Sequence, residues 1–190
     1  MEKGRLEAFS DGVLAIIITI MVLELKAPDA GDWHALQHLL PEFFGYVLSF
    51  AYVGIYWNNH HHMLKAAQRV NGSILWANLH LLFWLSLVPF TTAWVAKSDY
   101  AAVPITLYGV VLLLAAIAYF ILQWTIICEH GRESLLRTAL GSDLKGKLSP
   151  VLYLTAIVLS FWWRWAALAI YVLVALIWLV PDRRIARVVK

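Results

Sequence analysis

Six hydrophobic segments, separated by short polar stretches, run through the 190 residues of the chain. A helix needs about 20 residues to cross the ~30 Å hydrocarbon core of a bilayer, and most of these segments have that length. The pattern therefore predicts an all-α membrane protein with a single domain of six membrane-spanning helices over residues 1–190. The helices are expected at about 6–26, 38–63, 73–96, 102–128, 148–163 and 165–180.

Prolines and polar runs indicate where these helices start, bend or end. Pro41 is expected in the first turn of the second helix, and Pro89 predicts a kink in the third. Residues 97–100 predict a tight turn. The last two helices are short, about 24 Å for roughly 16 residues. Three tryptophans around Arg164 indicate that the turn between them lies at the membrane interface.

Composition agrees with a membrane protein and excludes several other classes. Hydrophobic residues make up 62% of the chain and charged residues 14%, whereas a soluble domain is about half apolar and a quarter charged. Cys128 is the single cysteine, so no disulfide can form within the chain. The net charge of +3 gives no reason to expect a nucleic-acid partner. Because no phosphate-binding loop or catalytic motif appears, we expect no enzyme activity.

Positive charges lie mostly on one side of the predicted bundle. Twelve of the 15 lysines and arginines fall at the two termini and in the second-to-third and fourth-to-fifth loops. Six spans bring all four of these segments to the same side. Since positively charged loops remain in the cytoplasm, both termini are predicted to be cytoplasmic.

Polar side chains gather at one membrane depth on three of the predicted helices. They are Arg5, Ser10, Asp11, Trp57, His61 and Asn78. Polar groups at membrane depth are costly unless they are paired, so one interpretation is a hydrogen-bonded network. The other is a set of independent residues that face the headgroups. The successive histidines 60–62 point about 100° apart around a helix, so we expect no metal site there.

An aliphatic stripe follows these polar residues on the first helix. Ile16, Ile20 and Leu23 recur at i, i+4 and i+7 on one face, and Thr19 lies beside them. Such spacing is typical of ordinary core or lipid contact. The alternative is a hydrophobic constriction of a pore, which one helix cannot enclose. That alternative requires several chains around an axis, or several helices of one chain.

Three motifs resemble the endolysosomal potassium channel family (transmembrane protein 175) and its prokaryotic relatives. They are Arg5-x-x-x-Phe9-Ser10-Asp11, Trp57-x-x-His60-His61, and Asn78-Leu79-x-Leu81-Leu82-Phe83 followed by Pro89-Phe90. The motifs fall in the first three helices, and the six-helix layout agrees along the rest of the chain. Gly12 departs from the pattern, since alanine is expected there in many relatives.

The resemblance implies a potassium-selective channel with passive conduction, located in the plasma membrane of a prokaryote. Animal members carry two six-helix repeats and dimerise, so a chain with one repeat is expected to form a homotetramer. The first helices of four copies would then line the pore. Ile16 would be the main constriction, Ile20 and Leu23 would extend it, and the Thr19 hydroxyl would contact a partly dehydrated cation.

The six polar residues would, on this resemblance, form the network that holds the pore-lining helix. The expected partners are further copies of the chain, the lipid bilayer, and potassium and other monovalent cations, with no cofactor. The filter sequence TVGYG is absent, so selectivity should be weaker than in ordinary potassium channels. Two alternatives remain: a proton-coupled or small-solute transporter with Asp11 and His61 as a proton relay, and a non-conducting membrane scaffold.

Overall fold

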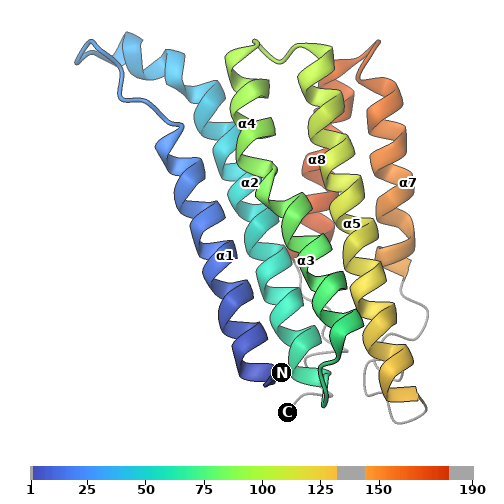
Figure 1. The fold of residues 1–190 in the computed structure, drawn as a ribbon. Helices are drawn as coiled ribbons and strands as arrows, with labels where there is room; N and C mark the ends of the chain where they lie inside the picture. Colours follow the sequence, from blue (N-terminus) through green and yellow to red (C-terminus); the bar gives the residue numbers. More distant parts are fainter. Residues whose placement is uncertain (1, 132–143, 180–190) are drawn as a thin grey trace.

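Seven α-helices build the part of the protein that the computed structural model describes, residues 2–131 and 144–179 (Figure 1). They are α1 (Lys3–Leu23), α2 (Trp33–Ala66), α3 (Gly72–Ser86), α4 (Val88–Lys97), α5 (Ala102–His130), α7 (Leu144–Leu159) and α8 (Arg164–Leu179). These residues contain no strand, as the hydrophobic pattern predicts. With α3 and α4 taken as one interrupted helix, the six predicted helices are all present.

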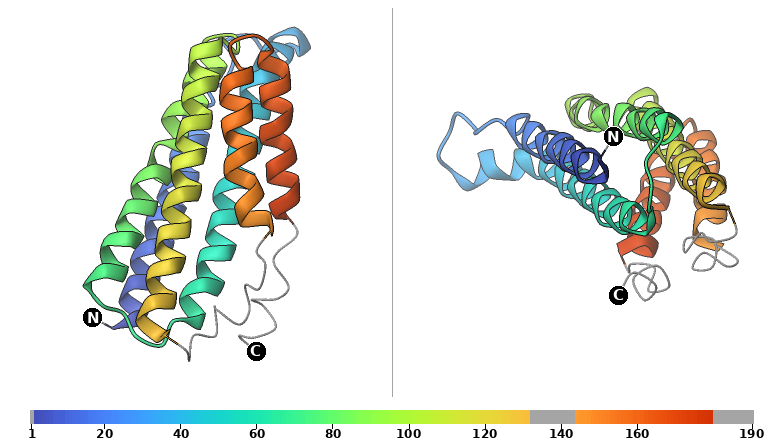
Figure 2. Two further views of the ribbon diagram at one scale, coloured as in Figure 1. Left: turned by 90° about the vertical axis from the view of Figure 1, so that its right-hand side faces the viewer. Right: turned by 60° about the horizontal axis from the view of Figure 1, so that its bottom comes forward.

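The helices lie side by side in one bundle, with α1 at an edge (Figures 1 and 2). α1 packs against α2, α3 and α4, whereas α7 and α8 pack against each other and against α5 on the other side, and α8 also contacts α2. Within the described residues, four spans are long and apolar enough to cross a membrane, namely α1, α2, the α3–α4 pair and α5. α8 is apolar but shorter. The chain is therefore a multi-pass membrane protein in its architecture.

The two ends of the bundle hold different loops. At the end where α1 begins, the His130 Nε2 atom accepts the backbone N–H groups of Gln68 and Arg69 at 2.9 and 3.1 Å. This contact joins the end of α5 to the α2–α3 loop. At the opposite end, called here the hairpin end, the α4–α5 turn lies beside the α7–α8 turn, where an Arg164 N–H donates to the Asp99 carbonyl at 3.4 Å.

The third span is broken at Leu87, two residues before Pro89. Proline lacks the N–H that would bond the carbonyl four residues earlier, and its ring clashes with that carbonyl. Beyond the break, the Thr92 hydroxyl donates to the Val88 carbonyl at 2.7 Å. The predicted kink is confirmed, and it takes the form of a break between α3 and α4.

The predicted start of the second helix is wrong. α2 begins at Trp33, because the Asp32 side chain accepts the backbone N–H of Ala35 at 2.8 Å and caps the helix there. Pro41 consequently lies inside α2 rather than in its first turn. The Pro41 carbonyl accepts the Tyr100 hydroxyl at 2.5 Å, which joins α2 to the α4–α5 turn.

Other helix ends differ from the sequence prediction by a few residues. α1 covers residues 3–23 where 6–26 was expected, and α7 covers 144–159 where 148–163 was expected. The turn predicted at residues 97–100 is present, with positive φ angles of 50° at Asp99 and 58° at Tyr100. The predicted polar loop after α5 lies mostly outside the described residues, as does the C-terminal arginine cluster.

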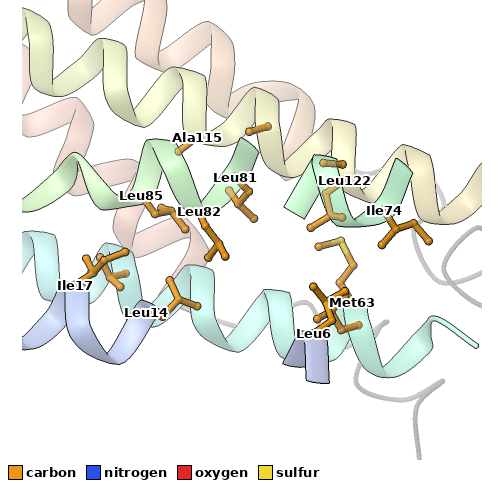
Figure 3. Packing of buried hydrophobic residues seen from close by; sticks show 14 of the residues in the cluster. Leu6, Leu14, Ile17, Met63, Ile74, Leu81, Leu82, Leu85, Ala115 and Leu122 are labelled. Atoms are coloured by element: carbon orange, nitrogen blue, oxygen red, sulfur yellow. The ribbon is translucent and has the colours of Figure 1, made fainter. Parts of the chain in front are cut away.

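Two apolar clusters hold the bundle together. The first joins α1, α2, α3 and α5 and includes Leu6, Leu14, Met63, Leu81 and Leu122 (Figure 3). The second joins α2, α4, α5, α7 and α8 and is rich in tyrosine, with Tyr52, Tyr108, Tyr153 and Tyr171. Burial of such large side chains contributes about 1.5–3 kcal/mol each in water, and packing takes over that role in lipid.

Gly109 of α5 allows α8 to approach closely, and its replacement tests the second cluster. A Cβ atom at position 109 would lie 2.7 Å from the Tyr171 Cζ and 2.9 Å from the Ile157 Cγ1. Tyr171 is fully buried, and its hydroxyl donates to the Ile105 carbonyl at 3.3 Å. We expect Gly109→Ala to reduce the free energy of unfolding by about 1–3 kcal/mol, the usual cost of overpacking. Thermal unfolding in detergent measures this loss.

Gly54 of α2 supplies the matched control for this substitution. Among the described residues, no atom beyond the adjoining backbone of α2 lies within 4 Å of a Cβ built at position 54, so Gly54→Ala meets no steric clash with another helix. Alanine is also a better helix former than glycine by ~1 kcal/mol. Gly54→Ala should therefore melt at or above the wild-type temperature, and equal melting of the two variants would contradict the packing argument.

Candidate functional site

α1 has a buried side and an uncovered side. Its buried residues recur every three or four positions: Leu6, Ser10, Leu14, Ile17 and Met21. On the uncovered side, Ile16 is 58% exposed, Ile20 44% and Leu23 77%. A single chain therefore leaves the whole aliphatic stripe available to lipid or to another chain.

Thr19 and Glu24 lie near this stripe. The Thr19 hydroxyl donates to the Ile16 carbonyl at 2.9 Å within the same helix, and its oxygen stays exposed. Near the end of the stripe that is closer to the hairpin end, a Glu24 carboxylate oxygen lies 2.9 Å from the Lys97 Nζ atom in an ion pair. Between the stripe and α4 lies an open groove of about 640 Å³, lined by Ile16 and Phe90 among others. The apolar stripe is thus flanked by the Thr19 hydroxyl oxygen and by the Glu24 carboxylate, whose charge Lys97 neutralises.

Ser10, His60 and Asn78 form a buried hydrogen-bonded chain across three helices. The Asn78 Nδ2 donates to the Ser10 Oγ at 3.0 Å, and the Ser10 hydroxyl donates to the Leu6 carbonyl at 2.9 Å. The His60 Nε2 lies 2.7 Å from the Asn78 Oδ1. Since that oxygen only accepts, the Nε2 carries the hydrogen and donates. The three residues are at most 2% exposed, so water cannot replace their hydrogen bonds. These bonds therefore hold α1 against α2 and α3.

Asp11, Trp57 and His61 form a second, more exposed group. The Trp57 Nε1 donates to the Asp11 Oδ1 at 3.0 Å, and the Trp57 and His61 rings stack with their centroids 6.2 Å apart. The structure therefore divides the expected network into two groups. The histidine that bonds Asn78 is His60, one residue before the expected His61.

His60 could have been identified from helical periodicity. The buried positions of α2 include Val53, His60 and Leu64, spaced by seven and four residues on one face. His61 lies 100° away from that face. His60 and His61 lie at nearly the same depth in the membrane, so depth alone does not show which of them is buried. The spacing of the buried residues of α2 does.

Arg5 belongs to neither group. Its side chain is exposed, and it makes no ion pair with Asp11 in the part of the chain that the structure describes. The two residues are six positions apart and so point about 120° apart around α1. Arg5 instead shares a face with Ile16, which lies eleven residues, or about three turns, further on. Arg5 therefore lies on the same face of α1 as the aliphatic stripe, about 16 Å before Ile16 along the helix.

The three successive histidines point in separate directions. His60 bonds Asn78, while His61 lies between Trp57 and His62, with ring centroids 5.7 Å apart in the second pair. Among residues 2–131 and 144–179, no three histidine, cysteine or acidic side chains gather where they could hold a metal ion. What this region offers is hydrogen bonding and packing.

Comparisons with known proteins identify relatives of this chain. The sequence model of the family described as "Endosomal/lysosomal potassium channel TMEM175" matches residues 5–89, which include both polar groups and the break in the third span. A potassium channel of Chryseobacterium sp. (strain P1-3) is 56% identical over 190 residues, covering 100% of this chain and 99% of that protein.

Two further relatives extend the comparison to a solved structure and to animals. The crystal structure of a lysosomal potassium-selective channel TMEM175 homolog from Chamaesiphon minutus matches with a TM-score of 0.80 and 30% identity, covering 95% of this chain and 98% of that one. The endosomal/lysosomal proton channel TMEM175 of Rattus norvegicus is 29% identical over 153 residues, which are 71% of this chain and 30% of the rat protein. Full-length similarity in sequence and fold, centred on the helices that hold the polar groups, means that this chain belongs to the TMEM175 family of ion channels.

Proposed function

We propose that this protein is a potassium-selective cation channel, formed by four copies around a pore that α1 lines. The observation that carries the proposal is the uncovered aliphatic stripe. Ile16, Ile20 and Leu23 are exposed on a helix whose other side is fully packed, and that helix lies at the edge of the bundle. If four copies surround a central axis, their aliphatic stripes face one another across that axis. The names of the bacterial relatives support potassium as the permeant ion.

Ile16 is the narrowest level of the proposed pore. Four isoleucines at one level form an apolar ring, and such a ring resists the passage of hydrated ions when it is narrow enough to exclude water. Ile20 and Leu23 extend the apolar path by about 6 and 10 Å along the helix. Thr19 offers a hydroxyl oxygen to a cation that has shed part of its water.

The two polar groups act as a scaffold for the lining helix. The bonds from Ser10 through Asn78 to His60 are buried, so they fix the rotation and depth of α1 relative to α3. The Asp11–Trp57 bond adds a second attachment to α2. A shift of α1 would break these bonds, so the scaffold determines the radius of the proposed constriction. Conduction needs no cofactor and no substrate binding step in this scheme.

We infer that the protein lies in the plasma membrane of a prokaryote with both termini in the cytoplasm. The bacterial relatives support the prokaryotic membrane. The distribution of charge supports the orientation, with twelve of the 15 lysines and arginines on the side of the termini. The α2–α3 loop lies at the same end of the bundle as the start of α1 (Figure 1). Lys65 and Arg69 are in or next to this loop, and the Lys3 Nζ donates to the Lys65 carbonyl at 2.9 Å.

Ion flux into liposomes tests the proposed function. Purified protein is reconstituted, and flux is measured under potassium, sodium and proton gradients against protein-free liposomes. We expect potassium flux that exceeds sodium flux, does not saturate at low concentration and needs no proton gradient. The proton arm is included because the rat relative is named a proton channel.

Each of the other outcomes of this test indicates a different function. Saturable flux that requires a proton gradient would indicate a proton-coupled transporter. Proton flux without potassium flux would indicate a proton channel, and no flux at all would indicate a membrane scaffold. The mass of the purified complex tests the assembly separately, since a monomer or dimer would contradict the four-fold pore whatever ion is conducted.

A further inference from the structure

An apolar groove of about 800 Å³ runs between α2 and α8 on the half of the bundle nearer the hairpin end. Its walls come from residues 37–51 of α2 and 165–179 of α8, and part of its floor from Val95 and Tyr108. Each wall is about 21 Å long at 1.5 Å per residue. That length exceeds the ~15 Å of one leaflet of a ~30 Å hydrocarbon core.

The groove is built for an apolar occupant. Phe44, Val172 and Leu176 on its walls are exposed, and within residues 2–131 and 144–179 other side chains leave them largely uncovered. The polar groups at its floor already bond one another, because the Ser49 Oγ lies 2.6 Å from the Thr92 Oγ1 and 3.1 Å from the Tyr108 hydroxyl. These floor groups hold α2, α4 and α5 together.

A positive charge lies at the hairpin end of this groove. The Arg164 guanidinium is exposed and lies 5.4 Å from the centre of the Trp165 ring, which lines the groove. Tyr100 also lines the groove, and its ring lies 5.6 Å from that of Trp165. In the described part of the chain, Arg164 has a backbone carbonyl, that of Asp99, as hydrogen-bond partner and no carboxylate within ion-pair distance.

Tryptophans place this charge at the level of lipid headgroups. Trp162 and Trp163 are strongly exposed and, with Arg164, line a second hollow of about 450 Å³ that shares Trp165 with the groove. Tryptophan is enriched at the membrane–water interface, and a guanidinium binds phosphate through parallel N–H donors. A lipid phosphate at the interface would therefore meet Arg164, and the hydrocarbon chain below it would meet the apolar groove.

We propose that the groove between α2 and α8 binds an acyl chain of a membrane glycerophospholipid whose phosphate contacts Arg164. The lipid belongs to the leaflet at the hairpin end. Its chain lies along Leu168 and Val172 of α8, against Phe44 of α2, where it fills space that water cannot occupy in the bilayer. The bound lipid adds to the direct contact between α2 and α8, where the Tyr52 hydroxyl donates to the Tyr171 carbonyl at 2.5 Å. This proposal is independent of which ion the protein conducts.

Native mass spectrometry of the intact, detergent-purified protein tests the proposal. The protein is titrated with phosphatidylglycerol and, separately, with a diacylglycerol that has the same chains and no phosphate. The wild-type protein should bind phosphatidylglycerol about tenfold more tightly than the diacylglycerol, as expected for a charge-assisted contact with the phosphate. Arg164→Gln should abolish that preference. Ala169→Trp, which fills the groove from an exposed position, should weaken the binding of both lipids at least tenfold.

Two further variants make the result interpretable. Leu173→Trp changes an exposed residue of α8 that does not line the groove, and it should bind both lipids like wild type. Val172→Trp fills the groove at a second exposed position, in case Ala169→Trp folds poorly. Undiminished lipid binding in both groove-filling variants would overturn the proposal. So would a wild type that binds no lipid while Ala169→Trp changes the oligomeric state, since the groove would then be an interface between copies.

Discussion

Asn78→Ala should destabilise the protein more than any other single change in the two polar groups. The substitution removes the donor to Ser10 and leaves the buried His60 Nε2–H without its acceptor. An unpaired buried donor costs about 1–3 kcal/mol, and the lost hydrogen bond adds about 1 kcal/mol. Thermal unfolding in detergent should therefore show a fall in melting temperature on the order of 10 °C.

The two neighbouring histidines provide the control for this prediction. His60→Ala should reproduce most of the loss, because His60 is buried and bonded to Asn78. His61→Ala should cost much less, because its described contacts are ring contacts with Trp57 and His62 near the surface. Equal losses from both histidines would contradict the division into two groups, and wild-type melting of Asn78→Ala would refute the scaffold.

Local chemistry made the helices predictable from the sequence. The number of spans follows from segment length and hydropathy, and the break in the third span follows from a proline that cannot continue a helix. The start of α2 was missed because two local signals compete: Pro41 suits a first turn, but the Asp32 cap lies nine residues earlier and sets the start. Capping is also a local signal, since aspartate is a favoured N-cap residue and Asp32 precedes Ala35 by three positions.

Rotation around each helix limited the prediction of the site. Sequence places Arg5 and Asp11 close in depth, yet they point about 120° apart, and Asp11 bonds Trp57 instead. Partners of this kind depend on how α1 and α2 pack, which is a property of the whole bundle. The aliphatic stripe was easier to recognise, because a face with bulky apolar residues is visible in the spacing of α1 itself. Its proposed role still depends on other copies of the chain.

Ile16→Asn should raise potassium flux through reconstituted protein tenfold or more. In the proposed pore, four aliphatic side chains at this level give an ion nothing to replace its lost water. Asparagine supplies amide groups that bind water and cations, so the energetic barrier at the ring falls, and each 1.4 kcal/mol of barrier corresponds to about a tenfold rate. Because the wetted ring no longer strips water from the ion, the preference for potassium over sodium should fall as well.

Val22→Asn separates this effect from a general effect of polarity on α1. Val22 is 45% exposed on the same helix, six residues from Ile16 and thus about 120° away around its axis. A polar residue there should leave the flux and selectivity close to wild type, since it does not face the proposed axis. Similar currents in both variants would show that the lining face of α1 is wrongly assigned. If the flux through Ile16→Asn equals that of the wild type, the barrier to conduction lies at another level of the pore.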